Sequence, residues 1–146
     1  AVFGTVTGGW LSDKYLGQPE PRNLDTVSMR MYKASLDRWS SGDWGLFQEL
    51  LQVLRTIADK HDSSIANVAV AWVLDQLGPD GGWAILGARD AIHIEEHVSL
   101  KRWVAESSAG GGEVHSLLDR EDRKLVTLVL SKGRGPVGDI WSHERR

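Results

Sequence analysis

The sequence contains no cysteine, which excludes both a disulfide framework and a metal site built on thiolates. Long hydrophobic runs are also missing, since a stretch such as AVAWVL at residues 69–74 is far too short to span a bilayer. There is no excess of basic residues either: the formal net charge is −3, whereas nucleic-acid binding favours basic patches. These absences predict a cytoplasmic protein that binds neither a membrane nor nucleic acid.

What is present is the composition of a globular protein. The 146 residues are 41% hydrophobic and 25% charged, and a chain of this length can bury a core of its own. The chain opens with AVFGTVTGGW instead of methionine, within what reads as the middle of a strand. This opening predicts a fragment or a processed piece of a longer protein.

The clearest helical pattern lies in residues 43–61. Apolar residues recur there at three- and four-residue spacing, which places them on one face of a helix. Asp43 stands where an N-cap is expected. The predicted buried face consists of Phe47, Leu50, Leu51, Leu54, Ile57 and Ala58.

Weaker patterns predict four further helices. Residues 63–78 have an apolar face, with Ser63 or Ser64 as a candidate cap and Gly78 at the end. The others are expected near residues 27–39, from Ala91 onward with Asp90 as cap, and within residues 118–133 with Asp119 as cap.

Two segments are predicted to be strands. Residues 1–9 begin as a short apolar strand and break at Gly8 and Gly9, while Trp83–Leu86 is an apolar run bounded by glycines, which suits a buried strand. Strands that alternate with helices predict a parallel α/β arrangement. Because two parallel strands make no sheet that stands alone, the pattern favours a piece of a larger α/β domain.

The second strand leads into an unusual junction, AILGARDAIHIEEH at residues 84–97. Gly87 permits a close backbone approach, and the free N–H groups at the start of the next helix carry partial positive charge. Arg89 adds a forked, permanently charged donor that suits phosphate oxygens. On the residues alone, the alternative is a polar surface turn with a solvated arginine.

Several segments together resemble the aldo-keto reductases. VFGTVTGGWLSDKY (2–15) is similar to their seventh strand and the loop after it, and SIANVAVAWVLDQ (64–76) to their Ala-Trp-Val-Leu helix. ILGARDAIHIEEH (85–97) resembles their eighth strand and cofactor turn, and the ending LLDREDRKLV…GPVGDIW resembles their C-terminal portion. The pieces follow the family's order over nearly the whole chain.

The resemblance implies a fold and a cofactor. The family is a (β/α)8 TIM barrel that reduces aldehydes and ketones with NADPH, and the loops after strands seven and eight of such barrels often hold phosphate. The expected fold class is therefore α/β: a C-terminal fragment of a TIM barrel, mostly helical with two parallel strands. Residues 1–146 are expected to be the C-terminal part of one NADP-dependent oxidoreductase domain, without the N-terminal part of the barrel.

The resemblance also implies residues for the adenosine end of NADP. The family's contacts to the ribose phosphate fall on Gly87, Arg89 and His93, and its contacts to adenine fall on Glu96 and His97. Two positions depart from the family, which usually has Arg, Lys or Gln in place of His93 and Asn in place of His97. The alternative for both histidines is an ordinary helix surface.

The loop after the first predicted strand, called the first loop below, would hold the other end of the cofactor. Phe3 falls at the aromatic position that stacks on nicotinamide, with a core phenylalanine as the alternative. The stretch that wraps the pyrophosphate falls on Gly4, Thr5, Val6, Gly8 and Lys14. Thr5 replaces a frequent proline, and Lys14 can neutralise phosphate charge or be an ordinary surface lysine.

No catalytic residue is predicted in this chain. The family's Asp, Tyr, Lys and His belong to its first half, where the tyrosine gives a proton to the substrate oxygen and the cofactor supplies hydride. Tyr15 and Tyr32 fall in a long loop region and match none of those motifs. His93 and His97 are four residues apart but have no third partner, so no metal site is expected.

Three functions remain open from the sequence. The first is the NADP-binding portion of an aldo-keto reductase, whose parent acts on a small-molecule carbonyl substrate while the isolated chain is inactive. The second is a non-catalytic relative that senses NADP or serves as an accessory subunit. The third is a truncated product that associates with itself through exposed strand edges. The expected protein partner of the chain is the missing N-terminal half-barrel or a second copy of the chain.

Overall fold

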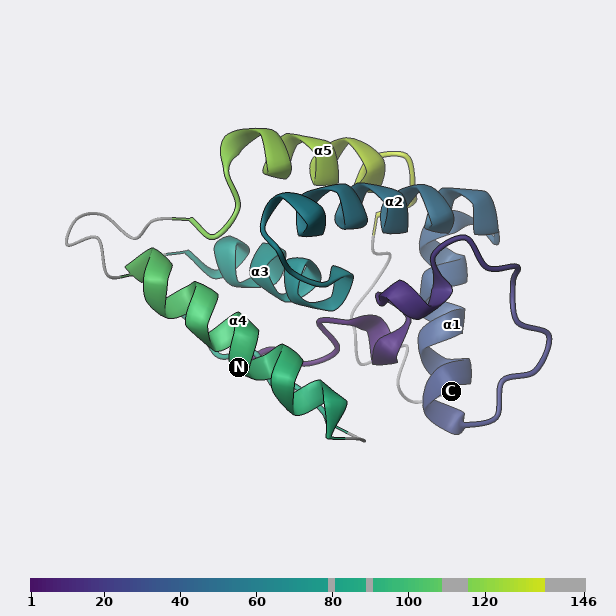
Figure 1. Ribbon diagram of the computed structural model, residues 1–146. Coiled ribbons are helices and arrows are strands. Elements are labelled where there is room, and N and C mark those ends of the chain that lie inside the picture. Colours follow the sequence, from purple (N-terminus) through teal and green to yellow (C-terminus); the bar gives the residue numbers. More distant parts are fainter. Residues whose placement is uncertain (79–80, 89–90, 109–115, 136–146) are drawn as a thin grey trace.

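A computed structural model describes residues 1–78, 81–88, 91–108 and 116–135. In Figure 1, α5 lies along α2, α3 lies beneath α2 with α4 beyond it, and α1 crosses the end of α2. Two short 3-10 helices, η1 and η2, precede α1. The bounds are Thr7–Gly9 (η1), Asp13–Tyr15 (η2), Val27–Ser40 (α1), Trp44–Lys60 (α2), Ile65–Leu77 (α3), Ile92–Ser108 (α4) and Arg120–Leu130 (α5).

Helix α2 is the centre of the fold. It packs against α1, α3, α5 and η2. Asp43 caps it by accepting hydrogen bonds from the amides of Gly45 and Leu46 at 2.8 and 3.3 Å. The predicted helix, its cap and its apolar face are confirmed, and the buried residues are Phe47, Leu50, Leu51, Leu54, Ile57 and Ala58.

The other predicted helices also form, for local reasons. Ser64 caps α3 by accepting from the Asn67 amide at 3.2 Å, and Gly78 ends it with a φ of 70°. Asp119 caps α5 and forms a reciprocal capping box with Asp122. The predicted cap Asp90 lies outside the described residues.

The predicted α/β fold with two parallel strands is wrong. The described ranges are helical and contain no strand, and the two segments expected to be strands share a single isolated parallel bridge between Val2 and Ala84. Trp83 and Ile85 are 79% and 59% exposed, so the segment is not a buried strand. A buried strand needs neighbours on both edges and both faces, and this part of the chain supplies one bridge.

An aromatic cluster ties the N-terminal segment to the helices. Trp10 is buried and stacks on Tyr15 with 4.6 Å between ring centroids, and its edge meets Phe47 of α2. The Trp10 Nε1 group donates a hydrogen bond to the main-chain oxygen of Met29 in α1 at 3.3 Å. The chain that follows η1 is therefore held against both α1 and α2.

Charged residues join the C-terminal end of α2 to the N-terminal end of α5. Asp122 is buried and accepts hydrogen bonds from Lys60 Nζ at 2.8 Å and from His61 Nε2 at 2.7 Å. The His61 ring also stacks on Trp103 of α4, with 4.8 Å between centroids. Lys60 bonds Asp119 as well, so one lysine bridges both acidic residues of the capping box.

This contact makes stability depend on pH in the acidic range. The hydrogen bond from Lys60, followed by that from the Asp122 amide, lowers the pKa of Asp119 from 3.8 to about 2. Because the folded pKa is depressed, the contribution is complete above pH 3.8 and is lost as the pH falls through about 2. We expect Lys60→Met to raise the pKa of Asp119 towards 3.8 in an NMR titration of its carboxyl carbon. An unchanged pKa would contradict this, and Lys124→Met on the exposed side of α5 is the control.

Candidate functional site

The candidate site begins at the bridge between the two predicted cofactor segments. The Val2 amide donates to the Trp83 oxygen at 2.7 Å, and the Ile85 amide donates to the Val2 oxygen at 2.8 Å. Because the bridge is parallel, both segments leave it in the same direction. The loop that starts at Phe3 and the turn that leads to Gly87 therefore start next to each other.

The first loop is a tight turn that needs glycine. Gly4 and Gly8 have positive φ values of 72° and 62°, which other residues rarely adopt. The Thr7 amide donates to the Gly4 oxygen at 2.8 Å and closes the turn. The Thr5 side chain is buried, and its Oγ1 has no hydrogen-bond partner among the described residues. An unpaired buried hydroxyl is unusual in a folded protein.

Asp13 anchors the end of this loop to the helices. One carboxylate oxygen accepts from Arg55 Nη1 of α2 at 2.5 Å, and the other accepts from the Ile65 amide of α3 at 3.2 Å. The neighbouring Lys14 is exposed, with its Nζ 5.3 Å from the centroid of the Tyr15 ring. Within the part of the chain that the structure describes, no carboxylate pairs with Lys14. Its charge is available for an anion.

Phe3 stands at the mouth of the first loop. Its side chain is 57% exposed, so it is not a core residue. The large side chains of Trp83 and Ile85, from the other partner of the bridge, are exposed as well. The bridge therefore has an apolar edge, and Phe3 at this edge can stack on a flat ring.

The second predicted segment divides between an open turn and the start of α4. Gly87 is exposed, and among the described residues no atom beyond its chain neighbours lies within 4 Å of the place where a Cβ would stand. Arg89 lies outside the described residues. His93, Glu96 and His97 are half-buried in the first turns of α4, where His93 Nδ1 lies 3.1 Å from Glu96 Oε2. His93 thus has a carboxylate partner, which competes with a phosphate.

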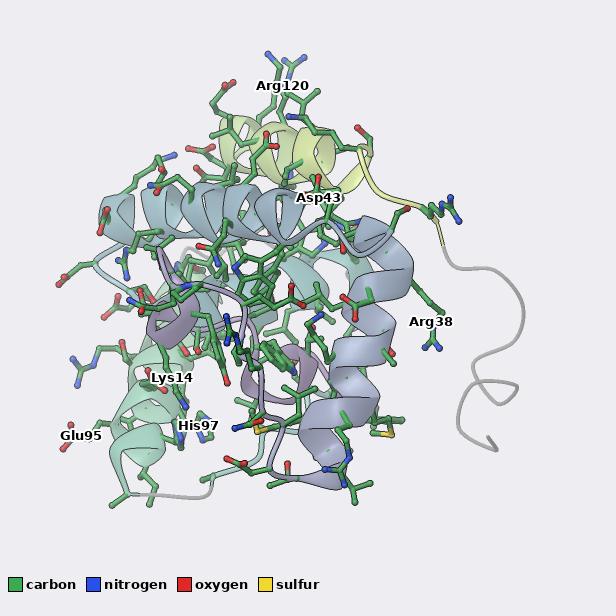
Figure 2. All side chains as sticks on the ribbon, turned by 90° about the vertical axis from the view of Figure 1, so that its right-hand side faces the viewer. Lys14, Arg38, Asp43, Glu95, His97 and Arg120 are labelled. Carbon is green, nitrogen blue, oxygen red and sulfur yellow. The ribbon has the colours of Figure 1, made fainter. Side chains whose placement is uncertain are left out.

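Helix α3 holds this part of α4 in place. The Nδ2 group of Asn67, a buried residue of α3, donates to the main-chain oxygen of Glu96 at 3.0 Å. In the view of Figure 2, Lys14 and His97 lie on the side of α4, whereas Arg120 lies at the opposite end of the molecule. Among the described residues, no hydrogen bond or ion pair joins a predicted residue of the first loop to one of α4.

Sequence reasoning missed two residues of this region. Asn67 interrupts an apolar helical stretch, and a polar residue at such a position is a signal that it has a buried partner. Tyr32 lies in α1, not in a loop, and its ring lies against Gly4 and Gly8. No sequence signal predicts the contact of Tyr32 with the two glycines, because it depends on how α1 crosses the first loop.

A hollow of about 630 Å³ lies elsewhere on the surface, and its lining is uncharged. It contains none of the predicted cofactor residues and no group that titrates near neutral pH, so it offers nothing for phosphate binding or proton transfer. The lining residues are Leu16, Gly17, Gln18, Pro19, Gln48 and Gln52.

Neither a metal site nor a membrane-spanning helix occurs among the described residues. The described ranges contain no group of three or more His, Cys, Asp or Glu side chains that could hold a metal ion. None of the helices that the structure describes is long and apolar enough to cross a membrane.

Comparisons with known proteins identify relatives of the chain. The model of the Aldo/keto reductase family matches residues 1–104, which include the bridge, both loops and most of α4. The chain is 29% identical over 148 residues to Flagellar radial spoke protein 5 of Chlamydomonas reinhardtii, an alignment that covers 91% of this chain. It spans 26% of the length of that relative. No solved structure matches.

Proposed function

This chain belongs to the aldo/keto reductase family, and from that membership we propose that it forms the NADP-binding part of an oxidoreductase. The family generally uses NAD(P)H. The parent enzyme would transfer hydride from NADPH to a small-molecule aldehyde or ketone. A segment that carries the family's catalytic residues, in the same protein or in a separate partner, would complete the active site, and the cytoplasmic location stays a prediction.

The parallel bridge is the observation that carries this proposal. It starts both predicted loops at one edge of the molecule, which is the arrangement that a single dinucleotide needs. The groups at this edge suit an anionic ligand. They comprise the open backbone at Gly87 and, further along the first loop, the exposed ammonium of Lys14.

In the proposed mechanism this chain binds and orients the cofactor. Phe3 stacks on the nicotinamide ring, and the turn from Gly4 to Gly8 with Lys14 holds the pyrophosphate. Arg89 and His93 bind the ribose phosphate, while Glu96 and His97 lie by adenine. NADPH supplies the hydride when it is bound. The proton donor would come from that other segment, so the isolated chain is expected to bind cofactor without turning over substrate.

A second candidate is a non-catalytic NADP-binding accessory or sensor protein. The similarity to Flagellar radial spoke protein 5 favours it, because that relative is named for the flagellar radial spoke and not for an enzyme activity. The two candidates differ in the sequence encoded upstream. An in-frame Asp, Tyr, Lys and His of the family would favour the enzyme, and an upstream sequence that lacks the tyrosine would favour the accessory protein.

Nucleotide titrations of Arg89→Ala test the cofactor assignment. We expect the variant to bind NADPH about tenfold more weakly, because hydrogen bonds to a charged phosphate contribute about 1.5–3 kcal/mol. NADH lacks the ribose phosphate, so its affinity should stay unchanged. Fluorescence of the reduced nucleotide measures both.

The matched control is Arg38→Ala on α1, an exposed arginine remote from α4 in Figure 2. It should leave both affinities at the wild-type value. Equal NADPH affinity of Arg89→Ala and wild type would remove Arg89 from the site, and a wild-type chain that binds neither nucleotide would overturn the proposal.

A further inference from the structure

Tyr32 covers the turn that the proposed function assigns to the pyrophosphate. A Cβ at Gly8 would come within 2.2 Å of Tyr32 Cδ2, and a Cβ at Gly4 within 3.2 Å of the Tyr32 hydroxyl oxygen. The ring thus reaches across the turn from one glycine to the other. Any side chain at Gly8 would collide with it.

The position of the ring is set by α1 and not by the loop. Thr26 caps α1 by accepting from the Met29 amide at 3.1 Å, and the Met29 oxygen in turn accepts from Trp10 Nε1. Trp10 directly follows η1 and is buried in the core. Helix α1 and the loop are therefore fastened to each other one turn before Tyr32.

Tyr32 is half-buried as a residue, and its hydroxyl has no hydrogen-bond partner among the described residues. A phenol that is partly withdrawn from water usually finds a partner. Thr5, in the same turn, also carries a buried hydroxyl without a partner. The Tyr32 hydroxyl lies over Gly4 of this turn, whereas the Thr5 hydroxyl is enclosed, so the phenol is the O–H donor that suits the oxygens of an anion.

We propose that Tyr32 is a further cofactor-contacting residue, whose hydroxyl donates a hydrogen bond to a pyrophosphate oxygen of the dinucleotide held by the first loop. The inference rests on the proposed function and adds to it a contact from α1. It also explains why Gly4 and Gly8 stand in this turn, since the ring occupies the space that their side chains would fill.

Tyr32→Phe tests this contact because it keeps the ring against the glycines and removes only the hydroxyl. The pyrophosphate is common to both nucleotides, so we expect NADPH and NADH to bind about tenfold more weakly alike. This pattern differs from that of Arg89→Ala, which is expected to weaken NADPH alone. Thermal unfolding of the variant should match the wild type.

The matched control is Tyr15→Phe, the same change at the other tyrosine, which is buried in the aromatic cluster. It should leave both affinities unchanged. Wild-type affinities for Tyr32→Phe would overturn the inference and leave Tyr32 a packing residue, while an effect of Arg89→Ala in the same experiment would leave the proposed function standing. Loss of affinity in Tyr32→Phe but not in Arg89→Ala would support Tyr32 and remove the arginine.

Discussion

Truncation of Leu51 to alanine should lower the free energy of unfolding by about 3–5 kcal/mol. Leu51 is fully buried on α2, the helix that packs against α1, α3 and α5. The variant loses the transfer free energy of the side chain and leaves a cavity that the neighbouring helices fill only in part. Globular domains have total stabilities of about 5–15 kcal/mol, so this loss would bring the chain close to unfolding.

Urea unfolding followed by far-UV circular dichroism and tryptophan fluorescence measures this loss. The matched control is Leu128→Ala on α5, where the leucine is 53% exposed. Its effect should stay within about 0.5 kcal/mol, as for most surface substitutions. Similar losses in the two variants would show that α2 is not the centre of the core.

Replacement of Asp122 by alanine has the second largest expected effect, about 3 kcal/mol. The carboxylate is 2% exposed and accepts from Lys60, His61 and the Asp119 amide. Its removal leaves His61 and the Asp119 amide without their acceptor at the junction of α2 and α5, while Lys60 keeps Asp119. Lys60 is half-exposed and can return to water, which keeps the cost below the upper range for a broken buried ion pair.

The same urea experiment measures the effect, with Asp59→Ala as the control. Asp59 is 70% exposed and pairs with Arg55. Arg55 also pairs with Asp13, and this second ion pair remains when Asp59 is replaced. An exposed pair of this kind contributes about 0.2–1 kcal/mol. A loss no larger for Asp122→Ala than for Asp59→Ala would show that the buried carboxylate does not stabilise the junction.

The helices could be predicted because their signals are local. The spacing from Phe47 to Ala58 defines the buried face of α2, and the side chains of Asp43, Ser64 and Asp119 cap the helices that follow them. Periodicity and capping involve residues within one or two turns of each other, so no tertiary information is required.

The strands could not be predicted in the same way. The run from Trp83 to Leu86 has the composition of a buried strand, but burial depends on what lies beside and above it. In the described residues this segment has one bridging partner, Val2, and no covering layer at Trp83 and Ile85. The composition of a run does not reveal whether neighbouring strands exist.

Only part of the candidate site could be predicted from the sequence. The resemblance to the aldo-keto reductases supplied positions in both loops, and the role of each stays a prediction. It offered nothing about Tyr32, whose contact with Gly4 and Gly8 arises from the crossing of α1. The resemblance also gave no indication of Asn67, which joins α3 to α4 by donating a hydrogen bond to the main-chain oxygen of Glu96. Contacts between elements distant in the chain are set by packing, which the order of residues encodes only indirectly.

The bridge has a consequence for the order in which the molecule assembles. More than half of the chain lies between Val2 and Ala84, and closing so long a loop costs entropy that two hydrogen bonds offset only after the intervening helices have packed. The edge shared by both loops is thus a late-forming contact on an already assembled scaffold. A dinucleotide bound across that edge would hold this last contact closed, so that ligand binding and the final step of folding become one linked equilibrium.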